Sequence, residues 1–334
     1  MIAAARAMVL EGPGQPLRLQ SLSVPEIEPG QVLIKVECCA ICRTDLHLLD
    51  GELAEIPYPV IPGHQVIGSV LASGAESLPP GRRVGVAWLG YTCGSCRYCR
   101  DGLENLCDHA GFTGYTRPGG YAEYLAADAR YCFAVDGAAS ATATAPLLCG
   151  GLIGFRALNM CADADRIGLY GFGSAAHILA QIIRFQGREF YAFTRPDDRD
   201  AIASARSLGA AWAGSSEQVP PRRLDAAIVF APVGALVPAA LRAVRKGGIV
   251  VCGGIHMSPI PEFPYELLWG ERQVRSVANL TREDGRNFLK LAAEVPVAAR
   301  TEVFPLAAAN EALQRLRAGR ITGSAVLSVA PDSG

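Results

Sequence analysis

The clearest regularity along the chain is a series of short apolar runs that alternate with amphipathic segments after about residue 151. Ile167–Tyr170 has the character of a buried strand, and His177–Gln186 then repeats apolar side chains at helical spacing. Further strands are expected at Phe190–Phe193, Ala226–Phe230 and Gly248–Cys252, and helices at Gly151–Leu158 and near residues 197–208 and 234–245. This alternation predicts an α/β fold, a doubly wound parallel sheet with helices on both faces.

Residues 1–150 follow a different pattern, with many Gly and Pro residues between short apolar runs. Val32–Val36 and Arg83–Ala87 are typical of strands, because turn-forming residues flank each of them. We therefore expect a mostly β domain before the α/β domain begins.

The tail of the chain returns to a mixed pattern from about Val295. Its pattern predicts a strand at Glu302–Leu306, an amphipathic helix at Ala309–Arg317 and a last strand at Val326–Val329. We expect this tail to rejoin the first domain. The predicted division is then residues 1–150 with 292–334, and residues 151–291.

Composition and charge narrow the classes of function. The 334 residues are half apolar and 19% charged, with a net charge of −1 and no long basic run, which argues against nucleic acid and anionic membranes as partners. No apolar stretch approaches the ~18 residues of a membrane span. The first residues lack the pattern of a secretory signal, so we expect a cytoplasmic protein. In that setting, eleven cysteines indicate metal binding or catalysis.

Four of these cysteines form a dense local motif. Cys93, Cys96, Cys99 and Cys107 follow the spacing C-x2-C-x2-C-x7-C within a segment of about residues 91–110. Two-residue spacings rarely reach disulfide geometry, whereas four thiolates suit a tetrahedral zinc ion. Such a site has no open position, so we expect a structural zinc here.

A glycine-rich turn follows the first strand of the α/β region. Gly171, Gly173 and Ala176 form the pattern G-x-G-x-x-A between a predicted strand and a predicted helix. In this context the pattern favours a dinucleotide whose pyrophosphate sits at the helix N-terminus. The alternative is an ordinary glycine-rich loop.

The end of the next strand bears on the choice of dinucleotide. It has Thr194 and Arg195, a hydroxyl and a guanidinium that suit a 2′-phosphate, where an acidic residue would favour NAD(H). The sequence therefore favours NADP(H) over NAD(H). The alternative is a solvated loop arginine that Asp197 and Asp198 neutralise.

The remaining cysteines and histidines do not define a site by spacing alone. Two local patterns stand out: residues 42–47, which place a thiol, a hydroxyl, a carboxylate and an imidazole together, and residues 62–68, which place a histidine on a glycine-flanked bend. Each alone is compatible with core or turn residues. Together, in a chain with a nucleotide-binding pattern, they favour a catalytic metal.

These motifs resemble those of the zinc-dependent medium-chain alcohol dehydrogenases, over nearly the whole chain and in the order that the family has them. The resemblance is closest to bacterial members with primary-alcohol and aldehyde specificity. The matching segments are Cys42-Arg43-Thr44-Asp45-Leu46-His47, Gly63-His64-Gln65-Val66-Ile67-Gly68, the four-cysteine segment, Pro146-Leu147-Leu148-Cys149-Gly150-Gly151 and the glycine turn. The resemblance implies a GroES-like catalytic domain and a Rossmann domain.

The resemblance also implies roles for individual residues. Cys42, His64 and Cys149 would ligate a catalytic zinc, which with the structural zinc makes two per chain. Thr44 would take the proton of the alcohol, and His47 would release it at the surface after it passes the nicotinamide ribose. Asp45 would orient His64. Relatives pair through the edge strand of the nucleotide domain, which we expect at Ile249–Ile255, in a homodimer or homotetramer.

Three positions depart from the family. Gln65 stands where relatives have Glu, and the loss of that charge is expected to make a bound alcohol more acidic. Ala176 ends the glycine turn, which the fold tolerates. Ser324 follows Gly323 where many relatives have an arginine for the pyrophosphate, which leaves Arg43 as the expected phosphate contact.

Trp88 stands where relatives have a bulky wall of the substrate pocket, so primary alcohols and aldehydes are expected over secondary alcohols. Its alternative role is a core aromatic. Two other functions stay open at this point. One is an NAD-dependent polyol or secondary-alcohol dehydrogenase, and the other is a catalytically silent protein that binds zinc and nucleotide.

Overall fold

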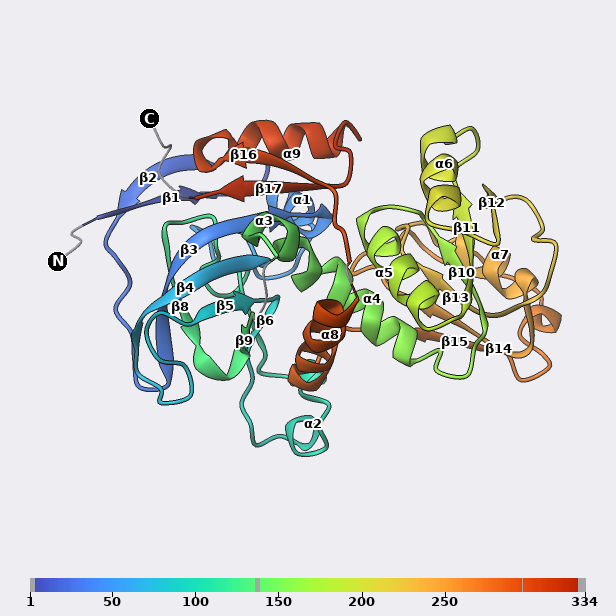
Figure 1. Cartoon of the computed structure of the whole chain (residues 1–334), viewed down its shortest axis with the longest axis horizontal. Coiled ribbons are helices and arrows are strands. Elements are labelled where there is room, and N and C mark those ends of the chain that lie inside the picture. Colours follow the sequence, from blue (N-terminus) through green and yellow to red (C-terminus); the bar gives the residue numbers. More distant parts are fainter. Residues whose placement is uncertain (1–3, 136–138, 296, 330–334) are drawn as a thin grey trace. The chain divides into compact units, whose positions relative to one another are not determined.

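The computed structural model describes residues 4–135, 139–295 and 297–329, which form two compact units (Figure 1). The first unit comprises residues 1–149, 279–289 and 298–334. The second comprises residues 150–278 and 290–297. Each is described separately below.

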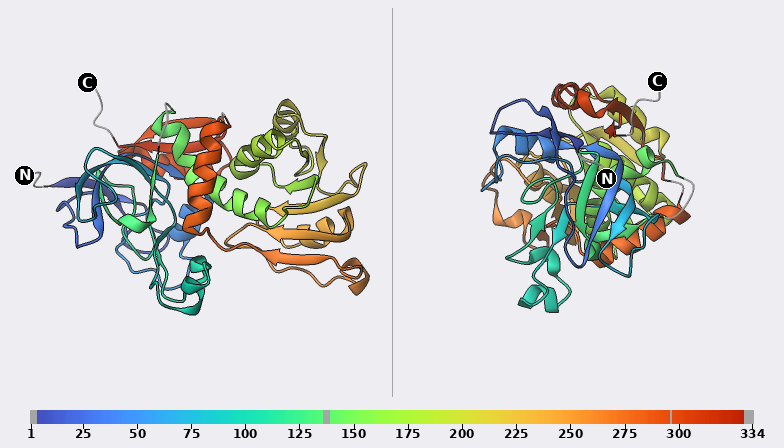
Figure 2. Two further views of the ribbon diagram at one scale, coloured as in Figure 1. Left: turned by 60° about the horizontal axis from the view of Figure 1, so that its bottom comes forward. Right: turned by 90° about the vertical axis from the view of Figure 1, so that its left-hand side faces the viewer.

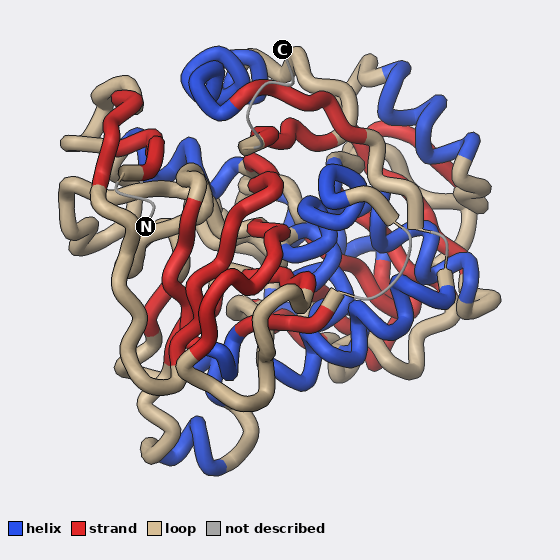
Figure 3. Tube along the Cα trace, turned by 60° about the vertical axis from the view of Figure 1, so that its left-hand side comes forward, coloured by secondary structure: helices blue, strands red, loops and turns tan. Residues whose placement is uncertain are grey.

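A seven-stranded sheet forms the centre of the first unit, and its strands are red in Figure 3. The strand order is β16 (Thr301–Pro305), β17 (Ser324–Ser328), β3 (Gln31–Ile41), β4 (Val66–Ser73), β5 (Arg83–Val86) and β9 (Cys132–Ala134), with β8 (Tyr124–Asp128) also paired to β3. Only β16 and β17 run parallel; the other pairs are antiparallel. In the first half of β3 the side chains of Val32, Ile34 and Val36 are buried in alternation, as expected for a sheet with one face on the core.

Smaller elements surround this sheet. They are β1 (Ala5–Val9), β2 (Arg18–Leu22), β6 (Leu89–Tyr91), β7 (Gly111–Phe112), α1 (Arg43–Asp50), α2 (Arg97–Arg100), α3 (Ala141–Thr144) and α9 (Ala309–Arg317). A further helix, α8 (Arg282–Glu294), has its first eight residues in the first unit and the rest in the second. The segment that carries α2 projects from the first unit (Figure 2) and contains the four-cysteine motif. Within the described part of the chain, no single helix is long and apolar enough to cross a membrane, and one bent pair, Ala141–Leu148 with Gly150–Asn159, passes that test by length and composition only.

The second unit is a six-stranded parallel sheet. The strand order is β12 (Trp212–Ser215), β11 (Glu189–Thr194), β10 (Arg166–Tyr170), β13 (Leu224–Val229), β14 (Val244–Cys252) and β15 (Gln273–Ser276). The chain moves outward from β10 in one direction and then returns to build the other side. Because such crossovers are right-handed, this reversal places helices on opposite faces of the sheet. The predicted doubly wound parallel sheet is confirmed.

Four helices belong entirely to this unit: α4 (Gly150–Asn159), α5 (Ser174–Phe185), α6 (Arg199–Ser207) and α7 (Leu236–Ala243). α5 packs against α4 and β11, and α7 packs against β13 and β14. Every residue of β13 is buried, which explains why this central strand is a continuous apolar run apart from Asp225. Each strand and helix expected in this region is present within a few residues of its expected bounds.

One expectation from the sequence needs correction. The expected edge strand, Ile249–Ile255, lies mostly in β14, which pairs with β13 on one side and β15 on the other. The edge on this side of the sheet is β15, a short strand whose four residues are all exposed, and β12 is the opposite edge. Residues 279–289 and 298–334 lie in the first unit, with residues 290–297 in the second. Within the first unit, Gly285 of α8 packs against the ring of Phe133, so closely that a Cβ on Gly285 would lie 2.2 Å from Cε1.

Candidate metal centre and cofactor turn

Cys42, His64 and Cys149 come from distant parts of the chain and lie together in the first unit. Cys42 Sγ is 3.3 Å from His64 Nε2 and 3.8 Å from Cys149 Sγ. The three potential ligand atoms all lie within 4.8 Å of one another. Two thiols and one imidazole are donors that zinc prefers, and three protein ligands leave a fourth tetrahedral position open. The donor set therefore fits a catalytic zinc.

Local structure explains how these side chains are held. Cys42 is the N-cap of α1, where its Sγ accepts a hydrogen bond from the Thr44 N–H at 3.4 Å. Asp45 completes a capping box, because its Oδ2 accepts from the Cys42 N–H at 2.8 Å. His64 follows Gly63, whose positive φ of 99° favours glycine. Cys149 caps the short 3₁₀ helix Ala145–Leu148.

Asp45 lies behind His64, on the side away from the two thiols. Its Oδ1 is 3.5 Å from His64 Nδ1, and both side chains are 1% exposed. Burial opposes protonation of the ring, but the charges of Cys42 and Asp45 outweigh it and raise the pKa of His64 to about 10. A carboxylate at Nδ1 directs Nε2 toward the metal and strengthens the imidazole as a ligand. Asp45 is thus in position for its expected role.

The thiols of Cys42 and Cys149 are in close contact, so each thiol affects the pKa of the other. A hydrogen bond from Cys149 lowers the pKa of Cys42 well below its ordinary value, with help from the nearby His64 ring. Zinc binds the thiolate form of cysteine. The lowered pKa of Cys42 therefore favours the form of this side chain that a zinc ion would bind.

Gln65 lies next to His64 and differs from the family's usual glutamate. Its side chain forms a hydrogen bond with the backbone of β3. Its side chain is 2% exposed, and its Nε2 donates to the Ala40 carbonyl at 3.2 Å. A glutamate carboxylate in the same place would meet that carbonyl oxygen without a donor. The amide is therefore suited to this pocket in a way that the family's usual residue is not.

The residues of the expected proton path lie on α1. Thr44 is half-buried next to Cys42, and Arg43 is exposed. The His47 side chain is 14% exposed, and its Nδ1 contacts a carboxylate oxygen of Glu52. Sequence analysis did not identify Glu52, which lies five residues after His47 and beyond the end of α1, where helical spacing gives no signal.

Trp88 lies directly beside the metal-ligand set. Its ring meets the His64 ring edge-on, with centroids 5.1 Å apart. Its other contacts are stacked, with Phe112 at 5.3 Å and Tyr115 at 5.6 Å. Three aromatic rings therefore form one wall next to the imidazole, and Trp88 is the member in contact with it.

The four-cysteine set is also assembled, although it is more exposed. Cys93 Sγ is 3.6 Å from Cys107 Sγ and 4.0 Å from Cys99 Sγ. All four sulfur atoms lie within 4.8 Å of one another. Hydrogen bonds from the backbone N–H groups of Ser95 and Cys96 lower the pKa of Cys93 to about 6. These donors fit a closed, four-sulfur zinc site.

Glu104 fixes this lobe to the rest of the first unit, and sequence analysis missed it. It is 4% exposed, and its Oε1 accepts from both the N–H and Nε of Arg282, each at 3.0 Å. The Arg282 guanidinium also lies 5.4 Å from the ring centroid of Tyr131. The partners are 178 residues apart, so no local pattern could have revealed the pair.

The glycine turn joins β10 to α5 in the second unit, as predicted. Gly171 has φ +89°, and a Cβ there would lie 2.9 Å from the backbone N of Ala231, so only glycine fits. Gly173 is the N-cap of α5 and offers no side-chain cap to the N–H groups of the first turn. Ala176 is fully buried. The N–H groups at the start of a twelve-residue helix suit a pyrophosphate.

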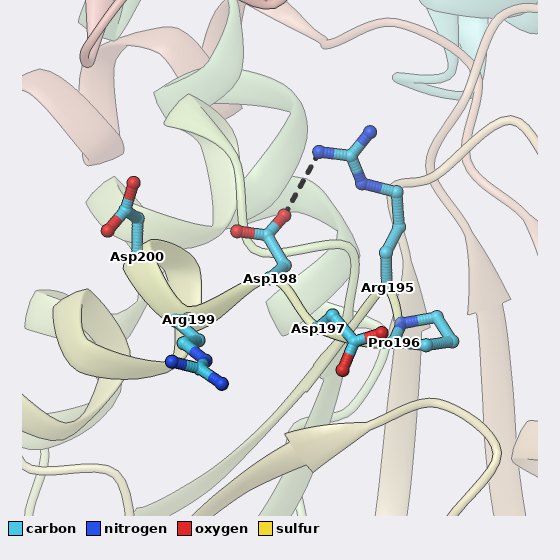
Figure 4. Close-up of a pocket in the computed structure, with 6 residues that line it drawn as sticks. All are labelled: Arg195, Pro196, Asp197, Asp198, Arg199 and Asp200. Atoms are coloured by element: carbon cyan, nitrogen blue, oxygen red, sulfur yellow. Dashed lines mark hydrogen bonds and ion pairs between the residues drawn. The ribbon is translucent and has the colours of Figure 1, made fainter.

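Thr194 and Arg195 lie at the end of β11, and their side chains have different surroundings. Thr194 is 3% exposed, and its hydroxyl lies within hydrogen-bond distance of two carbonyl oxygens, those of Arg195 at 3.0 Å and Gly214 at 3.4 Å. The Arg195 side chain is 87% exposed and pairs with Asp198 at 3.1 Å. Both charges border a surface hollow together with Asp197, Arg199 and Asp200 (Figure 4). Arg195, rather than Thr194, is thus available to a ligand.

Comparison with known proteins agrees with the geometry of these sites. Residues 28–137 match the model of the alcohol dehydrogenase GroES-like domain. The chain is 44% identical over 325 residues to the "Probable alcohol dehydrogenase AdhA" of Mycobacterium tuberculosis (strain CDC 1551 / Oshkosh), covering 94% of this chain and 93% of the relative. It is 33% identical over 344 residues to an alcohol dehydrogenase of Geobacillus stearothermophilus, covering 97% and 99%.

Solved structures of other dehydrogenases and reductases have the same fold. A cinnamyl alcohol dehydrogenase from Sorghum bicolor superposes with a TM-score of 0.90 at 26% identity, covering 98% of each chain. An acetophenone reductase from Geotrichum candidum in complex with NAD superposes with a TM-score of 0.88 at 25% identity, covering 99% of each chain.

Proposed function

Because this chain belongs to the zinc-dependent medium-chain alcohol dehydrogenases, we propose that it transfers a hydride between a primary alcohol, or its aldehyde, and NADP(H). The observation that carries the proposal is the convergence of Cys42, His64 and Cys149 with Asp45 behind the imidazole. The oxidation converts the alcohol and NADP⁺ to the aldehyde, NADPH and one proton. The protein must therefore bind both reactants and remove that proton.

Two zinc ions per chain are part of the proposal. Cys42, His64 and Cys149 would hold one, and Cys93, Cys96, Cys99 and Cys107 the other. When bound at the first set, zinc supplies a Lewis acid that polarises the substrate oxygen. The nicotinamide cofactor supplies the hydride acceptor or donor.

Residues of α1 would move the proton. Thr44, next to the ligand Cys42, takes the hydroxyl proton of the alcohol, and His47 passes it to solvent. The contact between His47 and Glu52 supports this, because a carboxylate at Nδ1 orients the ring. Replacement of His47 by Gln should slow turnover, because the path then lacks the group that passes the proton to solvent.

The size of Trp88 supports primary over secondary substrates. A second carbon substituent on the carbinol would have to fit beside a ring that three aromatic contacts hold in place. Replacement of Trp88 by Ala should raise activity on secondary relative to primary alcohols by about tenfold, the low end of the value of one methylene group in a pocket.

The exposed guanidinium groups of Arg195 and Arg199 support NADP(H). A 2′-phosphate would compete with Asp198 for Arg195. Replacement of Arg195 by Ala should raise KM for NADP⁺ and leave KM for NAD⁺ unchanged. The control is Arg222→Ala, which removes another exposed arginine of the same unit.

The second candidate is an NAD-dependent polyol or secondary-alcohol dehydrogenase. Three carboxylates, those of Asp197, Asp198 and Asp200, border the same hollow and would repel a 2′-phosphate. The relative from Geotrichum candidum is named for ketone reduction and was solved with NAD.

One experiment separates the two candidates. Matched primary and secondary alcohols are oxidised with NADP⁺ and NAD⁺ in parallel, and zinc per chain is measured on the same sample. The highest kcat/KM with a primary alcohol and NADP⁺ would support the proposal. A preference for secondary alcohols with NAD⁺ would support the second candidate, and two bound zinc ions without turnover would support a silent binding protein.

The proposal also covers the self-association of the protein and its location in the cell. β15 presents an unpaired strand edge, and the nearby Tyr265 and Trp269 are 72% and 60% exposed. We place a homodimer contact, or that of a tetramer of such dimers, at this edge. Val274→Lys on β15 should then shift the mass measured by light scattering toward the monomer. The eleven cysteines are all free thiols, which supports a reducing compartment such as the cytoplasm.

A further inference from the structure

Gln65 is buried next to His64, and both its backbone and its side chain bond to the same residue of β3. Its carbonyl oxygen accepts a hydrogen bond from the Ala40 N–H at 3.1 Å. Its side-chain Nε2 donates to the Ala40 carbonyl at 3.2 Å. Gln65 is 2% exposed and Ala40 is fully buried. The two residues are therefore joined at two points, away from solvent.

The register of the sheet explains why these two residues meet. Cys39 pairs with Val66 in the antiparallel ladder of β3 and β4. The next position places Ala40 opposite Gln65, one residue before β4 begins. The backbone bond thus extends the ladder by one residue. The side-chain amide supplies a donor to the Ala40 carbonyl, a buried acceptor that is costly to leave without one.

This two-point contact lies between two of the metal-ligand residues. Gln65 directly follows His64. Ala40 is two residues before Cys42, the N-cap of α1. The ligand atoms Cys42 Sγ and His64 Nε2 are 3.3 Å apart. Because the ends of elements open more readily than their centres, a side-chain bond at this point limits how far the two ligands can separate.

We propose that Gln65 is a positioning residue of the metal centre. Its two bonds to Ala40 hold the segment before β4 against β3 and thereby set the separation of Cys42 and His64. This inference rests on the proposed ligand set of the catalytic zinc. Its role differs from that of Asp45, which contacts the imidazole, because Gln65 fixes the segment that carries the imidazole.

The test compares full-length, zinc-loaded wild type with Gln65→Met, which keeps an unbranched side chain of similar length but has no donor. Zinc release to a chromophoric chelator is followed, and the phase that is absent from Cys149→Ser identifies the His64 site. Loss of a group that positions a ligand costs about 10–100-fold in metal affinity. Because Gln65 acts through the backbone, we expect this phase to accelerate by about tenfold. The visible bands of the Co²⁺-substituted site, which report its ligand field, should shift.

Hydrogen exchange at the Ala40 N–H supplies a readout that needs no metal. The acceptor of this N–H is the Gln65 carbonyl, so its exchange in the metal-free protein should be faster in Gln65→Met than in wild type. Unchanged protection would show that the side-chain bond does not hold this end of the ladder, and it would overturn the inference.

The matched control is Ser69→Ala, which removes another side-chain bond between the same two strands. The Ser69 hydroxyl on β4 donates to Glu37 Oε1 on β3 at 3.1 Å. Neither residue adjoins a metal ligand in the chain. Whatever its effect on the melting temperature, the control should leave the zinc release, the Co²⁺ bands and the exchange of the Ala40 N–H unchanged.

Equal release rates and superimposable Co²⁺ bands in wild type and Gln65→Met would also overturn the inference. So would the same acceleration in Ser69→Ala, because a general loosening of the sheet would then be the cause. Failure of the proposed function gives a different result. Wild type and Cys149→Ser would then contain the same amount of zinc, while the difference in hydrogen exchange at Ala40 would remain.

Discussion

The two cysteine-containing sets of the first unit are both suited to bind zinc, but they are assembled in different ways. Cys93, Cys96, Cys99 and Cys107 lie within fifteen residues, and three of them are half-buried. Cys42, His64 and Cys149 span more than one hundred residues, and their histidine is 1% exposed. The first set is held by its own short segment. The second exists only once the sheet of the first unit has formed.

The groups around each set differ as well. The local set, which is the four-cysteine set, is surrounded by backbone N–H groups and by one buried ion pair, Glu104 with Arg282. The dispersed set, which is Cys42, His64 and Cys149, is surrounded by a buried carboxylate, an aromatic wall and a threonine. A closed four-sulfur site contributes stability, whereas a three-ligand site beside reactive groups supports chemistry. The comparison predicts that damage to each set has a distinct consequence.

The largest expected effect is that of Cys149→Ser on turnover. Loss of the Lewis acid removes several kcal/mol of transition-state stabilisation, so kcat/KM should fall by about a thousandfold. The free energy of unfolding should change little, because the sheet does not depend on this metal. Steady-state kinetics and urea unfolding on the same preparation check both parts. A large loss of stability with retained activity would reverse the assignment of the two sets.

The next effect is that of Cys99→Ser, which should act mainly on stability. Loss of a structural metal belongs to the class of changes that cost more than about 4 kcal/mol of unfolding free energy. Limited proteolysis should cut within residues 91–110 in this variant. The control is Cys132→Ser, because Cys132 belongs to neither set and its Sγ donates to the Asp128 carbonyl at 3.4 Å, as a serine hydroxyl also would. Equal stability of the two variants would contradict the structural role.

The same comparison shows what the sequence allowed us to predict. The local set was recognisable because all four ligands lie in one short spacing pattern. The dispersed set required resemblance to a family, because its sulfur atoms meet only through folding across 107 residues. Gly171 and β10 were predictable since strand, turn and helix are consecutive.

The failures have physical causes too. Ile249–Ile255 has the more apolar sequence, but apolar character marks a strand with neighbours on both sides. The edge strand on that side, β15, is short and fully exposed, with three polar residues out of four, as edge strands tend to be. The pairing of Arg282 with Glu104 joins residues 178 positions apart, which no local pattern encodes.

A smaller effect is expected from Glu104→Gln, which tests how the local set is attached. The substitution keeps the size of the side chain but leaves the Arg282 guanidinium without its buried charge partner. Because Arg282 is partly exposed, we expect a loss of about 2–3 kcal/mol, at or below the usual range for breaking a buried pair. Asp101→Asn is the control, since its pair with Arg97 in the same lobe is exposed and should contribute less than about 0.5 kcal/mol. Both values follow from urea unfolding of zinc-loaded protein. Equal losses would show that Glu104 is not an anchor.

The smallest expected effect is that of Asp225→Asn on the unfolding free energy. It tests whether part of this free energy depends on a charged group and not on bound metal. Asp225, in the second unit, is 8% exposed and accepts hydrogen bonds from Arg166 and Arg245. Burial opposes its charge, but these arginines outweigh burial and lower its pKa to about 2. A lowered pKa gives stability that is present above the ordinary carboxyl value of about 4 and is lost as the pH falls toward 2.

This contribution amounts to about 2 kcal/mol. It should survive removal of zinc by a chelator, because neither cysteine set belongs to the second unit. The measurement is the unfolding free energy of the second unit between pH 5 and pH 2.5, for metal-free wild type and metal-free Asp225→Asn. The wild type should lose more stability than the variant over this interval. Parallel curves would mean that the acid sensitivity of this unit comes from other groups, and the contrast between a metal-held and a charge-held part of the protein would fail.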